Sequence, residues 1–275
     1  MNIDTLFLQQ NALPTIPKVV QEVIDSFNDD HISIDEISKK LSADQVLSAK
    51  LLRLANSSYY HFSRSIGTVD EAVLMLGFMS VRTLVISSGL TGGFKPVHGL
   101  DLQQFWHYSL RVAVISKWIA KKIKNNQDFA FLIGLMHAIG QLVMRAAMPG
   151  QMSEVDKLAH FFDARRANAE VDMLGYSFFD IGSELAKRWR FPETFSTAIK
   201  ECASPLASTE FNPVSGVVHV AIWLARAREC ACSQEEMEAT IPEDLLLRLG
   251  LTTALILDEM PPFSEISEGL DGLIN

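Results

Sequence analysis

Cysteine is scarce in this 275-residue chain: the three present are Cys202, Cys230 and Cys232, and their spacing matches no disulfide framework. A small secreted scaffold held together by disulfides is therefore not indicated, and reduced thiols of a cytoplasmic protein fit the count better. Cys230 and Cys232 could form a metal or redox pair. On a helix, however, residues two apart face different directions, which favours ordinary thiols.

Basic residues are also few. The chain has 24 Lys and Arg against 33 Asp and Glu, a formal net charge of −9 and a pI near 5.3. Proteins that bind nucleic acids usually carry a basic footprint, so nonspecific DNA or RNA binding is disfavoured.

Long uninterrupted apolar runs are lacking as well. The richest stretch, 129–144, is broken by Gly134, His137, Gly140 and Gln141, so no membrane span is expected. The first residues have neither a basic nor an apolar leader region, so no secretory signal is expected either.

Helix-start signals, by contrast, recur along the whole chain. A Ser or Thr followed three residues later by Glu, Gln or Asp can satisfy the free N–H groups of a first helical turn. The pairs are Ser33–Glu36, Ser42–Gln45, Thr68–Glu71, Ser177–Asp180 and Ser233–Glu236. Between them, apolar residues recur at helical spacing. The sequence therefore predicts an all-α fold of short to medium helices joined by tight turns.

Three helical lobes or segments are predicted. Residues 1–95 form an N-terminal helical lobe that ends at the Gly-Gly-Phe-Lys-Pro break, residues 96–228 form a second lobe, and residues 229–275 form accessory helices and a loose acidic tail. The stretch 81–90 suits a strand or a helix, and its helical neighbours favour a helix. Residues 127–147 predict one central, buried helix that stops at Pro149 and Gly150.

Three histidines, His107, His137 and His219, lie in strongly apolar segments. A lone histidine on such a helix is more often a hydrogen-bonded core residue than a ligand, although three of them could converge. Divalent metals in phosphoryl-transfer sites require carboxylate oxygens, and no carboxylate adjoins these histidines in the sequence. A catalytic serine lacks an orienting partner beside them.

Several motifs resemble a known family. The segment GLMHAIGQL (134–142) is similar to the signature helix of HD-superfamily phosphohydrolases, HDIGKL. The order of further motifs resembles the HDOD family, the HD-related output domain, over about residues 6–225: LPTIP (13–17), KLLRLANS (50–57), IGTVDEAVLMLG (66–77), FWHYSL (105–110) and WRFP (189–192). The resemblance implies an HD-domain-like helical bundle with an N-terminal helical lobe, and a bacterial cytoplasmic signalling role.

The same resemblance implies that the metal site is lost. His107 and His137 remain at HD positions, but the Asp of the His-Asp doublet is Ala138, a later His is Phe178, and the final Asp is Ile222. These are vestigial positions, so no metal, cofactor or catalysis is expected. The two remaining histidines are expected to form a buried polar pair.

The expected function is therefore non-catalytic signal transduction through binding. Another signalling protein is the expected partner, a small effector is an alternative, and neither membrane nor nucleic acid is expected. Candidate contacts between lobes or with an effector are Arg53, Asn56, Ser57, His107, His137 and Trp189. Asn56, near a helix end, could also close that helix in the left-handed conformation. Arg165 and Arg166 are expected as solvated surface charges, with an anion site as the alternative.

Two other functions stay open. One is a residual metal-dependent HD phosphohydrolase that uses His107, His137 and His219. The other is a regulator that binds nucleic acid or a cyclic dinucleotide. The partner, the input signal, the regulated process, the oligomeric state and the role of Cys230 and Cys232 are not encoded in any pattern recognised here.

Overall fold

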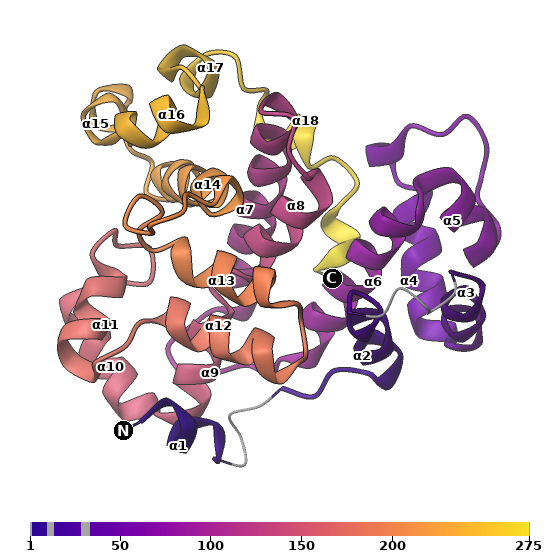
Figure 1. Cartoon of the computed structure of the whole chain (residues 1–275), viewed down its shortest axis with the longest axis horizontal. Coiled ribbons are helices and arrows are strands. Elements are labelled where there is room, and N and C mark those ends of the chain that lie inside the picture. The colour runs from indigo at the N-terminus through magenta and orange to yellow at the C-terminus, as the bar shows by residue number, and fades with distance from the viewer. Residues whose placement is uncertain (1, 10–13, 29–33, 275) are drawn as a thin grey trace.

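The computed structural model describes residues 2–9, 14–28 and 34–274, and these residues contain helices and no strand. The predicted all-α class is thus confirmed. Figure 1 shows one group of helices, α2 to α6, beside a larger bundle built from α7 to α14, with the last helices folding back over both.

The N-terminal lobe is organised around α6 (Phe78–Gly93), which contacts α2, α4 and α5 of the same lobe and α8 of the second lobe. Every residue from Val81 to Leu90 is buried, so the helical assignment of the ambiguous stretch 81–90 is confirmed. Around α6 lie α2 (Lys18–Asp25), α3 (Ile34–Ala43), α4 (Gln45–Ala55), a short 3-10 turn η1 (Ser58–Tyr60) and α5 (Val69–Leu76).

The predicted helix starts form in part. Ser177 and Asp180, and Ser233 and Glu236, make the reciprocal hydrogen bonds of a capping box. Thr68 accepts from the Glu71 N–H, but the Glu71 carboxylate accepts from Gly67 instead of Thr68.

The helix start predicted at Ser42 and Gln45 is wrong. Asp44 caps α4 by accepting from the N–H groups of Val46 and Leu47, while α3 continues through Ser42. An aspartate caps a helix as well as a serine does, and Asp44 stands directly before α4. Ser33 lies outside the described residues.

The second lobe is built around α7, α8 and α14, which pack against one another. Gly134 of α8 has only hydrogen where a Cβ would lie 2.8 Å from the Ala113 Cα, so these two helices approach closely. The helices of this lobe are α7 (Leu102–Lys122), α8 (Gln127–Met136), α9 (Ile139–Ala147), α10 (Pro149–Leu158), α11 (Arg166–Leu174), α12 (Phe178–Arg188), α13 (Glu193–Glu201) and α14 (Pro213–Glu229).

The single helix predicted over residues 127–147 is wrong, because the chain breaks at His137 and Ala138 between α8 and α9. By length and composition the stretch Gln127–Ala147 could cross a membrane, and in the described chain it is the only such stretch. Of its most apolar window, 89% is buried inside the protein. This stretch packs as core of the second lobe.

The first helix crosses to the second lobe. Helix α1 (Ile3–Phe7) belongs to the range 1–95 but lies against α9. The Arg188 guanidinium donates to the Asp4 carboxylate at 2.9 Å and stacks over the Phe7 ring. The chain therefore begins on one lobe and enters the other at α2.

The C-terminal segment contains α15 (Gln234–Thr240), α16 (Glu243–Leu249), α17 (Thr253–Leu257), α18 (Phe263–Ile266) and the 3-10 turn η2 (Asp271–Leu273). The loose tail expected here is wrong. Leu270 and Leu273 are 1% and 0% exposed, and the Thr91 hydroxyl donates to the Leu273 carbonyl at 2.7 Å. Burial of these two apolar side chains stabilises the packing of the C-terminal segment against the N-terminal lobe (Figure 1).

Candidate functional site: a degenerate HD centre and a neighbouring pocket

His137 stands at the end of α8, where its Nδ1 lies 2.6 Å from the Gly134 carbonyl oxygen. The side chain is 1% exposed. Burial, with a smaller contribution from the nearby charge of Arg226, lowers the pKa of His137 to about 4, although the bond to Gly134 opposes the shift. The imidazole is therefore neutral at physiological pH.

The positions where the resemblance places lost metal ligands are apolar and buried. Ala138, Phe178 and Ile222 are 1%, 6% and 4% exposed, and none of their side chains carries a donor atom for a metal. In the part of the chain that the structure describes, no three His, Cys, Asp or Glu side chains are grouped to hold a metal ion. The residues at this centre do not fit the metal site of an HD hydrolase.

The buried polar pair expected between His107 and His137 is wrong. His107 is half-buried and makes no hydrogen bond, ion pair or ring contact among the described residues. The adjacent Tyr108 instead meets His137 edge-on, with 5.4 Å between ring centroids. Burial raises the pKa of Tyr108 to about 12, partly offset by Arg226. The charge of Arg226 thus acts on both Tyr108 and His137.

A buried polar network lies behind this centre. Glu170, 0% exposed, accepts from the side chains of Arg166 and Gln141 and from the backbone N–H of Phe178. Arg166, 1% exposed, also donates to Asp156 at 2.6 Å. The expectation of a solvated Arg166 is therefore wrong, whereas Arg165 is exposed and pairs with Asp163.

The C-terminal segment covers part of the KLLRLANS motif (50–57). Arg53 donates to the Gly272 carbonyl at 2.7 Å, and Ser57 lies against Gly269. Asn56 has φ of −89°, so the left-handed expectation for it is wrong. Its side-chain amide instead pairs with both backbone groups of Ile66, at 2.7 and 2.8 Å. Asn56 therefore anchors the loop after α4.

Trp189 lies where the lobes meet. Its carbonyl accepts from the Gln21 side chain at 2.7 Å, and its ring packs against Phe94 with 6.3 Å between centroids. Arg190, whose φ is +61°, extends this contact through a 2.6 Å ion pair with Asp25. Of the candidate contact residues, Trp189 joins the two lobes directly.

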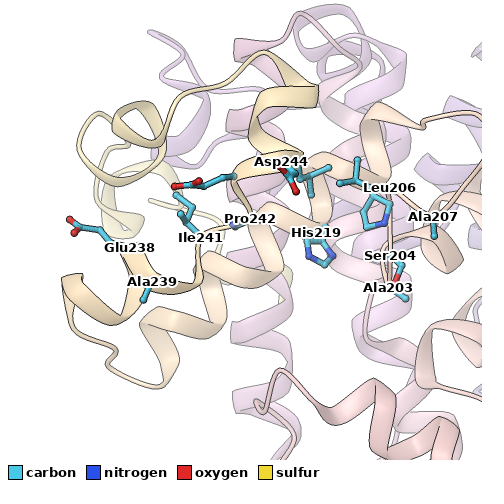
Figure 2. A pocket seen from close by; sticks show the side chains of 13 residues that line it. Ala203, Ser204, Leu206, Ala207, His219, Glu238, Ala239, Ile241, Pro242 and Asp244 are labelled. Atoms are coloured by element: carbon cyan, nitrogen blue, oxygen red, sulfur yellow. The ribbon is translucent and has the colours of Figure 1, made fainter.

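His219 is separate from these contacts and lines an open pocket of about 640 Å³. Figure 2 shows its imidazole between the 203–207 loop and the connection from α15 to α16. Its Nδ1 lies 2.7 Å from the Cys202 carbonyl oxygen. Cys202 itself is buried and free, and Cys230 and Cys232 are also free thiols. No sequence pattern predicted this pocket, because its walls come from three separate segments.

The helical bundle around the His137-Ala138 doublet has the architecture of an HD-like domain. A family model described as "HDOD domain" matches residues 13–205. The chain belongs to the HDOD family.

Two solved structures are similar across nearly the whole chain. A Shewanella amazonensis SB2B protein named "Putative phosphohydrolase" is 28% identical with a TM-score of 0.77, covering 98% of this chain and 96% of that one. An HDOD domain protein with unknown function from Geobacter sulfurreducens is 25% identical with a TM-score of 0.71, covering 95% and 91%.

Among curated proteins, an uncharacterized protein of Treponema pallidum (strain Nichols) is 23% identical over 237 residues. The alignment covers 85% of this chain and 45% of that protein. The chain thus spans less than half the length of the curated relative that it matches.

Proposed function

We propose that this chain is a non-catalytic HDOD regulatory protein of the bacterial cytoplasm, which acts by binding another signalling protein or a small effector. The observation that carries the proposal is the chemistry of the degenerate centre. Ala138, Phe178 and Ile222 replace potential ligands with buried apolar groups. Without carboxylates, the centre lacks the anionic oxygen ligands that anchor a divalent cation and orient a hydroxide for attack on phosphorus.

The state of His137 supports the same proposal. Its Nδ1 donates to a backbone carbonyl, and its ring is buried against Tyr108. A metal ion drawn to this centre would also meet the positive charge of Arg226, whose influence reaches His137. The side chains here stabilise the packing of α7, α8 and α14.

A metal-dependent phosphohydrolase is the second candidate, favoured by the name of the Shewanella protein, which is 28% identical. The two candidates differ in metal content. The test is elemental mass spectrometry of the full chain purified without a His-tag, combined with hydrolysis of bis(p-nitrophenyl) phosphate in the presence of added Mn²⁺.

The expected result is strongly substoichiometric metal and no hydrolysis above the buffer rate. Near one equivalent of a transition metal, together with hydrolysis that both His107→Ala and His137→Ala abolish, would overturn the proposal. Circular dichroism of each variant separates lost ligation from lost folding. His107→Ala is the cleaner variant, because His107 is half-buried and makes no polar contact in the described chain.

A further inference from the structure

The pocket at His219 lies between the second lobe and the accessory helices. Its walls come from the loop after α13, from α14 and from the segment that joins α15 to α16 (Figure 2). Apolar side chains, among them those of Leu206, Ile241 and Leu245, form part of the wall. At about 640 Å³, the pocket is within the range that holds small ligands.

Most polar side chains that line the pocket, namely His219 and three carboxylates, can accept hydrogen bonds. Because a carbonyl can only accept, the bond to Cys202 places the hydrogen of His219 on Nδ1. Burial, helped by the nearby charge of Arg226, holds the pKa of His219 below its ordinary value, so the ring stays neutral. Its Nε2 then carries a lone pair and makes no hydrogen bond among the described residues, on a ring that lines the pocket.

The mouth of the pocket is acidic. Glu238, Glu243 and Asp244 line it, and all three are exposed. No Lys or Arg is among the lining residues. Among the lining residues, an anionic ligand would meet three carboxylates and no cationic side chain, whereas a cation would be attracted. The lone pair of His219 and the carboxylates accept hydrogen bonds, so these lining groups favour a ligand that donates them.

We propose that this pocket binds an aliphatic amine, with an ammonium group at Glu243 and Asp244 and a second N–H donating to His219 Nε2. The alkyl chain between the two nitrogens lies along the apolar wall. The same chemistry belongs to a free diamine or polyamine and to a lysine side chain of a partner. This inference rests on the proposed binding function and names the class of ligand.

The test is isothermal titration calorimetry of the full chain with hexamethylenediamine, and with hexanediol as the uncharged analogue of the same length. Saturable one-site binding of the diamine, weakened by added salt, is expected, with no binding of the diol. Equal binding of both compounds, or binding of neither, would overturn the proposal. Metal content and hydrolysis are measured separately, so a failure here leaves the proposed non-catalytic function standing.

The variant Glu243→Gln/Asp244→Asn removes two charges from exposed positions while keeping the shape of the mouth. It is expected to weaken diamine binding about tenfold. The matched control is Glu235→Gln/Glu259→Gln, which removes the same charge from exposed carboxylates that do not line the pocket. Equal weakening by both variants would show a nonspecific effect of net charge and would overturn the site.

A third titrant, lysine with both backbone ends blocked, distinguishes the sources. If the blocked lysine binds and the Glu243/Asp244 variant weakens it, the pocket accepts a partner's side chain. If only the diamine binds, the pocket takes a free polyamine. Each result supports the amine site and identifies which form of amine it takes.

Discussion

The Nδ1 atom of His137 lies 2.6 Å from the Gly134 carbonyl oxygen, three residues earlier in α8. In a continuous helix, that carbonyl would accept from the N–H of residue 138. The imidazole competes for this acceptor, and α8 ends at Met136. The histidine of the HD signature therefore has a structural role here, as the residue at which one apolar stretch becomes two helices.

The neutral state of His137 predicts a pH-dependent stability. Its folded-state pKa of about 4 lies below the ordinary value of 6.5, so the unfolded chain binds more protons between these values. Stability is therefore fully present above pH 6.5 and is lost as the pH falls toward 4. When the pH falls from 7 to 5, the titration of this residue alone should lower the free energy of unfolding by about 2 kcal/mol.

Urea unfolding of the wild type and of His137→Gln at both pH values checks this prediction. The variant begins less stable at pH 7, because it disturbs a buried hydrogen bond. Its further loss at pH 5 should be smaller than that of the wild type by about 2 kcal/mol. An equal loss in both proteins would show that His137 does not control the acid sensitivity.

The contact between α9 and α12 predicts a strong effect at Gly140. A Cβ at this position would overlap the Phe178 carbonyl oxygen and lie 2.9 Å from the Gly182 nitrogen. Both are backbone atoms, so the helices must separate, and Gly140→Ala should lower the free energy of unfolding by about 3 kcal/mol, the upper end of the usual range for overpacked cores. Gly150→Ala is the control, because no atom lies within 4 Å of its Cβ position and alanine favours helix. A thermal melt that ranks the two variants in the opposite order would contradict the packing of these helices.

The buried ion pair between Glu170 and Arg166 should contribute strongly to stability. Glu170→Ala leaves Arg166, which is 1% exposed, without one of its carboxylate partners, and leaves the Phe178 N–H without an acceptor. The expected loss of unfolding free energy is about 3–5 kcal/mol. Glu154→Ala breaks an ion pair whose two side chains are 67% and 56% exposed, and should cost about 0–1 kcal/mol. Similar losses in both variants would show that the network is not stabilising.

The sequence predicted the helical class and the degenerate centre because both depend on local signals. Apolar spacing and capping residues specify helices within one segment, as at α12, where Ser177 and Asp180 form the predicted capping box. The stretch 81–90 was ambiguous by itself, and its helical neighbours decided the assignment. The replacement of a potential ligand by Ala138 is likewise visible in one residue. Ser42 shows the limit even of local signals, since Asp44 was an equally good cap and stood nearer to the helix.

Features that join distant segments could not be predicted. Arg166 stands beside Arg165 in the sequence, yet one is buried on Glu170 and the other is in solvent. Arg226 is four residues after Ile222, so helical spacing alone places it on the same face of α14, but only the fold brings that face near Tyr108 and His137.

The return of the C-terminal segment to the N-terminal lobe predicts that Leu273 stabilises the whole chain. The residue is 0% exposed, and its carbonyl accepts from Thr91. Leu273→Ala removes buried apolar surface and leaves a cavity, which costs about 2–5 kcal/mol. Leu247→Ala, at a site that is 80% exposed, should cost no more than about 0.5 kcal/mol. Urea unfolding measures both losses of free energy. Hydrogen exchange is a second measurement: because η2 contacts α4 and α6, these two helices should lose protection only in the Leu273 variant. If Leu273→Ala lowers the free energy of unfolding no more than Leu247→Ala does, the C-terminal segment does not stabilise the N-terminal lobe.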